Sequence, residues 1–170
     1  MSRKLDHWNE VPAHEAMAAV LPCCGSMAWA RGLVARQPLR DEASLLAASD
    51  EIWNSLCERE WMEAFSKHPR IGEREAPAAA SAQSASWSEQ EQHKVAAAGE
   101  PAQESLAQAN REYEQRFGRV FIVCATGKSA MEILDILRRR LQNDDAAELR
   151  EAAEEQRKIT NLRLKKWLEA

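Results

Sequence analysis

The sequence predicts an all-α fold, a single-domain bundle of about seven to nine helices with no sheet. Glycine and proline occur only six times each, while alanine, glutamate, leucine and arginine are abundant, a composition that favours helix. Apolar residues recur at helical spacing along most of the chain. The length of 170 residues is typical of one domain, which we expect to cover residues 1–170.

Capping and breaking residues mark where the expected helices begin and end. Serine and aspartate cap the starts of helices, proline is tolerated in the first turn, and glycine commonly follows the last turn. These rules predict helix boundaries at Pro12, Gly25-Ser26, Asp41, Pro101 and Gly118.

Two segments depart from the helical pattern. Residues 76–87 are rich in alanine and serine with a single proline, so we expect a loop there, with helix resuming at Ser88. Val120 to Ala125 is the only β-like run and has no partner strand elsewhere, so it is expected to form a buried extended connector.

Charge and composition exclude several classes of protein. The formal net charge of −4 argues against nucleic-acid binding, and no run of about 18 apolar residues predicts a membrane span. None of the four cysteines forms a C-x-x-C pair, which argues against zinc and favours reduced thiols in a cytoplasmic protein. Gly127-Lys128-Ser129 lacks the preceding glycine of a phosphate-binding loop.

His68 is the first candidate for chemistry. Because proline disfavours helix in the residue before it, Pro69 places His68 at a helix end. An imidazole accepts and releases protons near neutral pH. A helix-terminal histidine that only satisfies nearby carbonyl groups gives the same pattern, and these residues alone favour that structural interpretation.

The segment Ser88-Glu89-Gln90-Glu91-Gln92 is the second candidate. Its S-x-x-E spacing matches a capping box, and spacing alone favours that interpretation for Ser88 and Glu91. A functional role is compatible with capping, because free N–H groups at a helix start suit an anionic ligand. A carboxylate there would stay ionised and could accept hydrogen bonds from a ureido or amide N–H group.

Arg163 is the third candidate, on a last helix capped by Asp144 or Asp145. At about 100° per residue it falls about 40° from Ile159, inside the apolar arc, whereas Lys165 falls on the polar side. A buried guanidinium needs a partner. A structural carboxylate and a bound anion are both open on the sequence alone.

Four segments occur in the order and spacing of a known family and together span essentially the whole chain. The protein resembles the 2-oxo-4-hydroxy-4-carboxy-5-ureidoimidazoline (OHCU) decarboxylases. The segments are FSKHPRIGE at 65–73, Ser88-x-x-Glu91-Gln92, Phe117-Gly118 with Val120 to Ala125 and Gly127-Lys128-Ser129, and ITNLRL at 159–164.

The resemblance implies a homodimer without cofactor or metal that decarboxylates OHCU, a small anionic ureido compound, to (S)-allantoin during urate breakdown. It implies that His68 is catalytic. Whether His68 acts as a base, as an acid at C5, or as both stays open, as does closure of the 76–87 loop over substrate. The residues that the resemblance implies for substrate binding are Pro69, Ser88, Glu91, Gln92, the backbone around Val123, and Arg163.

Two alternatives accompany this hypothesis. One is a helical interaction module that has kept the fold and lost the reaction, although such a module has no need of His68, Glu91, Gln92 and Arg163 together. The other is a sister enzyme that acts on a related ureido acid. Only assays with substrates distinguish these alternatives.

Overall fold

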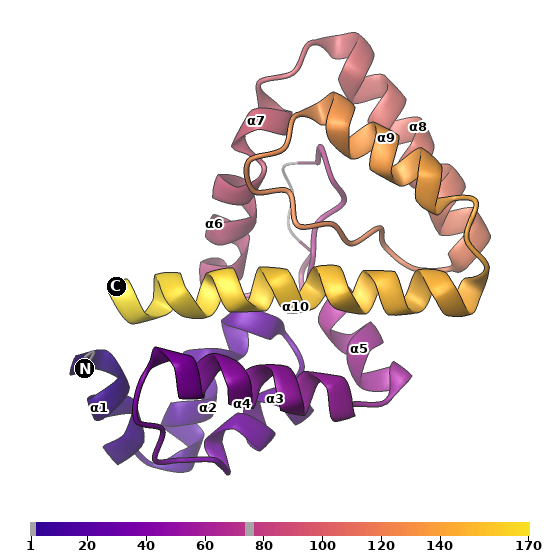
Figure 1. Cartoon of the computed structure of the whole chain (residues 1–170). Helices are drawn as coiled ribbons and strands as arrows, with labels where there is room; N and C mark the ends of the chain where they lie inside the picture. The colour runs from indigo at the N-terminus through magenta and orange to yellow at the C-terminus, as the bar shows by residue number, and fades with distance from the viewer. Residues whose placement is uncertain (1–2, 74–76) are drawn as a thin grey trace. The chain divides into compact units, whose positions relative to one another are not determined.

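The computed structural model describes residues 3–73 and 77–170, and this part of the chain forms ten α-helices (Figure 1). No β-strand occurs among the described residues, so the predicted all-α class is confirmed. The helices are α1 (Arg3–Glu10), α2 (Ala13–Cys24), α3 (Met27–Val34), α4 (Glu42–Ser55), α5 (Glu58–Phe65), α6 (Ala82–Glu91), α7 (His93–Ala96), α8 (Glu100–Phe117), α9 (Ala130–Arg140) and α10 (Asp145–Glu169).

The predicted helix boundaries are confirmed where local capping chemistry sets them. Gly25 ends α2 in the left-handed conformation, with φ of 89°, and Gly118 ends α8 in the same way. Ser26 caps α3, and Asp41 caps α4 in a capping box with Ser44. These contacts join residues three or four apart, so the sequence is sufficient to place them.

The predicted start of α6 is wrong. Helix begins at Ala82 rather than Ser88, so residues 82–87 are helical and not part of a loop. The Oγ atom of Ser81 caps the helix by accepting the amide of Ser84 at 3.1 Å. Alanine-rich sequence has high helix propensity once it is capped. Of the expected 76–87 loop, residues 77–81 are non-helical and Ala76 lies outside the described residues.

The structure divides into two compact units. The prediction of one domain over 1–170 stays a prediction. The first unit comprises Met1–Ala64 and Arg157–Ala170. Within it, α3 packs against both α2 and α4. Its core is rich in tryptophan, and the buried indole N–H of Trp29 donates to Ser49 at 3.1 Å.

The second unit comprises Phe65–Gln156, with α8 packed along α9 (Figure 1). Its core surrounds Tyr113, Phe117 and Phe121. Residues 121–125 are buried and belong to neither helix nor strand, which confirms the predicted connector. The second unit therefore contains His68, α6 and this connector.

A buried ion-pair cluster lies at the end of the connector. The guanidinium of Arg140 donates to the Glu148 carboxylate, with Nε at 2.9 Å from Oε1, and to the carbonyl of Ile122 at 2.6 Å. The Glu148 carboxylate also accepts the hydroxyl of Tyr113 and the amide of Asn143. Arg140 and Glu148 are both fully buried, and each is the charged partner of the other. Pairing of this kind offsets the cost of removing two charges from water.

Candidate active site

His68 lies in the turn that follows α5, as the sequence predicts. Its backbone N–H donates to the Phe65 carbonyl at 3.1 Å, which closes the last turn before Pro69. The side chain is buried, with 8% of its surface exposed. Its Nε2 atom lies 2.7 Å from Oε1 of Gln156, a fully buried residue of α10. The imidazole is therefore held by a neutral side-chain amide.

The turn after His68 is held by side chains of α8 and of Gln92, which lies between α6 and α7. The backbone N–H of Gly72, which has φ of 89°, donates to Oε1 of Gln92 at 3.0 Å, and the amide of Asn110 donates to the carbonyl of Ile71 at 2.9 Å. Arg70 binds the carboxylate of Glu114 through two nitrogens. These contacts hold the backbone next to His68 in one conformation.

Ser88 and Glu91 do not form the predicted capping box. They lie in the second half of α6, three residues apart, and both are buried, with 4% and 9% of their surfaces exposed. The cap of α6 is Ser81. The capping explanation for this motif is thus wrong, and so is the argument that a helix N-terminus attracts an anion there. Their burial on one face of α6 is compatible with the functional interpretation.

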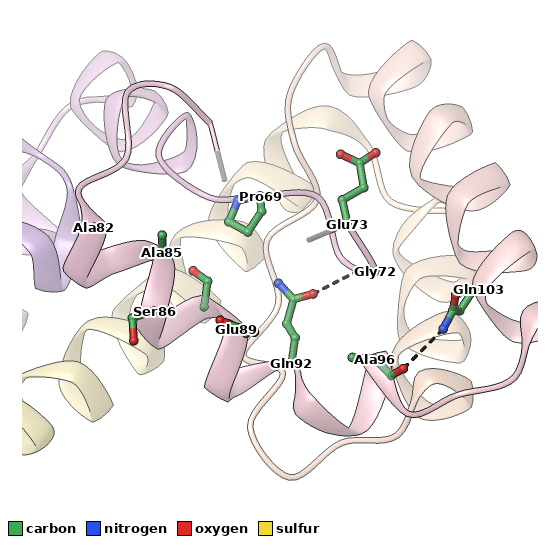
Figure 2. A pocket seen from close by; sticks show the side chains of 11 residues that line it. Pro69, Gly72, Glu73, Ala82, Ala85, Ser86, Glu89, Gln92, Ala96 and Gln103 are labelled. Atoms are coloured by element: carbon green, nitrogen blue, oxygen red, sulfur yellow. Dashed lines mark hydrogen bonds between the residues drawn. The ribbon is translucent and has the colours of Figure 1, made fainter. Parts of the chain in front are cut away.

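A cavity of about 470 Å³ opens beside the His68 turn (Figure 2). Three of the predicted residues, Pro69, Ser88 and Gln92, line it. Its walls also carry the carboxylates of Glu73 and Glu89, and the described lining residues include no lysine, arginine or histidine. A wall of amide, hydroxyl and carboxylate groups suits a ligand with several N–H and C=O groups.

Figure 2 shows how Gln92 is oriented at this cavity. Its side-chain oxygen faces Gly72, whose N–H it accepts, and its nitrogen lies on the side away from Gly72. Because the oxygen is engaged, Gln92 offers its NH₂ group as a donor. A donor in this position can bind a carbonyl or carboxylate oxygen.

Val123 lies in the connector between two anchored residues. The Ile122 carbonyl accepts from Arg140, and the backbone N–H of Cys124 donates to Oε2 of Glu155 at 2.8 Å. Val123 is buried, with 4% of its surface exposed. Its backbone is therefore held rigidly on both sides, as a substrate-binding backbone segment would require.

Arg163 belongs to the first unit and is buried, with 1% of its surface exposed, so the prediction from the helical wheel is confirmed. Lys165 is exposed, also as predicted. Burial raises the pKa of the Cys24 thiol to about 12, and the Arg163 charge partly opposes this increase. Burial likewise raises the pKa of Cys23 against the same charge. Arg163 therefore extends its charge toward two thiols on α2 that stay protonated at neutral pH.

Gln156 is the site residue that sequence reasoning missed. On the helical wheel that identified Arg163, Gln156 falls about 60° from Ile159, inside the same apolar arc. A buried amide on an apolar face also needs a partner. The criterion used for Arg163 would have found Gln156, although not its contact with His68.

The structure adds two findings on ligand and membrane binding. Across residues 3–73 and 77–170, no three histidine, cysteine, aspartate or glutamate side chains are grouped closely enough to hold a metal ion. None of the helices there has the length and apolar character required to cross a bilayer.

The fold and site define an all-helical protein in which Pro69, the residue that follows a buried histidine, lines a polar cavity. The chain belongs to the OHCU decarboxylase family, because the family's model matches residues 9–165. A uric acid degradation bifunctional protein of Arabidopsis thaliana is 35% identical over 144 residues, which are 85% of this chain. The match covers 44% of that relative, so the chain spans less than half of the relative's length.

Solved structures agree with this family. The crystal structure of an OHCU decarboxylase in the presence of (S)-allantoin superimposes with a TM-score of 0.76 and 32% identity, covering 88% of this chain and 96% of that one. The crystal structure of an (S)-allantoin synthase gives a TM-score of 0.72 over 96% of this chain and 53% of its own. At 18% identity, the second match supports the fold alone.

Proposed function

We propose that this protein decarboxylates OHCU to (S)-allantoin in urate breakdown. The observation that carries the proposal is the buried His68 in a braced turn beside a cavity that Pro69, Ser88 and Gln92 line. Membership of the family supports the reaction. So does the similarity to an OHCU decarboxylase that was crystallised in the presence of (S)-allantoin.

The proposed reaction needs no electron sink from the protein. The bond between C4 of OHCU and its carboxylate breaks, and the electron pair forms a C4=C5 double bond while the C5=N pair moves to nitrogen. Carbon dioxide leaves, and the ring nitrogen that received the C5=N pair takes up a proton. The C4 hydroxyl then loses its proton, a proton is added to one face of C5, and C4 becomes the carbonyl of allantoin. Because the substrate accepts the electrons, we include independence from cofactor and metal in the proposal.

The protein's part is orientation and proton transfer. We assign the proton transfer to His68, at the C4 hydroxyl, at C5, or at both. The NH₂ group of Gln92 donates to a substrate oxygen, while the Glu91 carboxylate accepts ureido N–H groups. Pro69, Ser88 and the backbone of Val123 complete the binding surface, and Arg163 pairs with the substrate's negative charge.

The proposal extends to assembly and location. We infer a homodimer, which the resemblance to the family implies, and this is measured by sedimentation equilibrium. We also infer a cytoplasmic location, which is consistent with four cysteines that are all free.

A chiral assay tests the reaction. OHCU generated fresh from urate is mixed with the protein in buffer containing EDTA, and circular dichroism follows the product. We expect (S)-allantoin to form faster than the spontaneous reaction. Racemic allantoin at the spontaneous rate would instead support the interaction module, and activity restored only by added metal would contradict metal independence.

A further inference from the structure

The contact between His68 and Gln156 decides which ring nitrogen carries the proton. Nε2 of His68 lies 2.7 Å from the amide oxygen of Gln156, and both side chains are buried. An amide oxygen only accepts hydrogen bonds, so Nε2 must be the donor. In a neutral imidazole the lone pair then lies on Nδ1.

The chemical type of the partner also matters. A carboxylate beside a histidine favours the imidazolium form and raises the pKa of the ring. The amide of Gln156 orients the ring in the same way but adds no charge. It therefore fixes the tautomer of His68 without placing a charge beside the ring.

Gln156 is itself held in place. The preceding residue of α10, Glu155, accepts the backbone N–H of Cys124 at 2.8 Å, which ties this turn of the helix to the connector. Gln156 has no exposed surface, so its amide has little freedom to turn away from the ring. Glu155 therefore binds the connector that carries Val123, and the adjacent Gln156 binds the turn that carries His68.

We propose that Gln156 is a positioning residue for His68, which it holds as the Nε2–H tautomer so that Nδ1 is the nitrogen that accepts the proton in catalysis. The inference rests on the proposed function, since it concerns proton transfer in that reaction. The other ionisable side chains on the segments that carry His68 and its neighbours fall into four groups. They are Lys67, Arg70 and Glu73 in the turn, Glu89 and Glu91 on α6, Arg119, Cys124 and Lys128 in residues 119–129, and Glu154 and Glu155 on α10.

An isosteric substitution tests the proposal. Gln156→Glu keeps the acceptor and adds a negative charge, so the pKa of His68 should rise by about one unit or more. The acid limb of the pH–rate profile should move to higher pH by the same amount, with turnover recovered above it. Gln115→Glu, which adds the same charge on an exposed position of α8, should leave the limb in place.

Removal of the acceptor gives a second kinetic readout. Gln156→Leu should lower kcat by at least about tenfold, because the ring loses its tautomer and orientation. KM and allantoin binding should change much less, since Gln156 acts through His68 and not on the substrate. A fall in kcat and an equal rise in KM would overturn the positioning role.

Nuclear magnetic resonance tests the contact without turnover. In ¹⁵N-labelled protein, with the His68 signals assigned by their loss in His68→Gln, Nε2 should be the protonated nitrogen at high pH. The Nδ1–H tautomer, or a His68 titration unchanged in Gln156→Glu, would overturn the proposal. A parent protein without turnover whose His68 titration still moves in Gln156→Glu would refute the proposed function and leave the tautomer assignment standing.

Discussion

Two groups of buried polar side chains in the second unit differ in charge. In the ion-pair cluster, the charges of Arg140 and Glu148 neutralise each other at zero exposure. At the His68 turn, three neutral amides make contacts: Gln156 contacts the imidazole, while Gln92 and Asn110 bind backbone groups of Gly72 and Ile71. A buried ion pair locks both members in their charged forms, whereas a neutral amide holds its partner without setting its charge. The ion-pair cluster therefore stabilises the connector, whereas Gln156 orients the His68 imidazole without adding a charge beside it.

The largest expected effect is on stability and comes from the ion-pair cluster. Arg140→Leu leaves the Glu148 charge buried without its partner, which should lower the free energy of unfolding by about 3–5 kcal/mol. The neighbouring Arg139→Leu loses only an exposed pair with Glu151 and should cost about 1 kcal/mol or less. Urea unfolding measures both. If both variants lost a similar free energy of unfolding, the buried cluster would contribute no more to stability than a surface ion pair.

The next effect is on turnover and comes from His68. His68→Gln still forms hydrogen bonds but does not exchange a proton near neutral pH. It should lower kcat by at least about 100-fold while the protein still binds allantoin. The acid limb of the parent, expected where imidazoles ordinarily titrate at about pH 6–7, should vanish. Near-parental turnover, or a surviving acid limb, would assign the proton transfer to another group.

The third prediction concerns Glu91, a buried carboxylate on α6. Because Ser81 caps α6, Glu91→Gln removes no capping contact and should cost little stability. It should still lower kcat/KM, because the ionised acceptor for ureido N–H groups is lost. Steady-state kinetics and thermal unfolding measure the two effects. A loss of stability at unchanged activity would make Glu91 a structural residue.

Arg163 tests whether another buried arginine resembles Arg140. Arg163→Lys keeps the charge but loses the planar fork, so it should weaken allantoin binding, measured by calorimetry, in a folded protein. The exposed Lys165→Ala on the same helix should change little. If Arg163→Lys unfolds the protein and residual binding is normal, Arg163 is structural in the way that Arg140 is.

The smallest effect concerns the cysteines. Burial raises the pKa of Cys23, Cys24 and Cys124, so these thiols stay protonated and shielded at pH 8. Only Cys57 is exposed. A thiol reagent should therefore modify one residue in native protein and four in urea, as counted by mass spectrometry. Fast native modification of Cys23 or Cys24 would mean that the core beside Arg163 opens readily.

The helical class, most helix ends, the buried connector and the burial of Arg163 were all predictable from the sequence. These features depend on capping hydrogen bonds between residues three or four apart and on apolar periodicity. Both signals can be read from a few consecutive residues. The order of the motifs likewise indicated the family. The same local rule failed at Ser88, because S-x-x-E spacing does not distinguish a helix start from a pair on one face of a helix that began earlier.

The tertiary structure alone decided which groups meet. His68 and Gln156 are 88 residues apart, and Gly72 and Gln92 are 20 apart. No local pattern pairs such residues, because their contact depends on how α6, α8 and α10 pack around the connector. The sequence could therefore name His68 as a proton carrier, but only the fold could give it a neutral partner and so assign the nitrogen that accepts the proton.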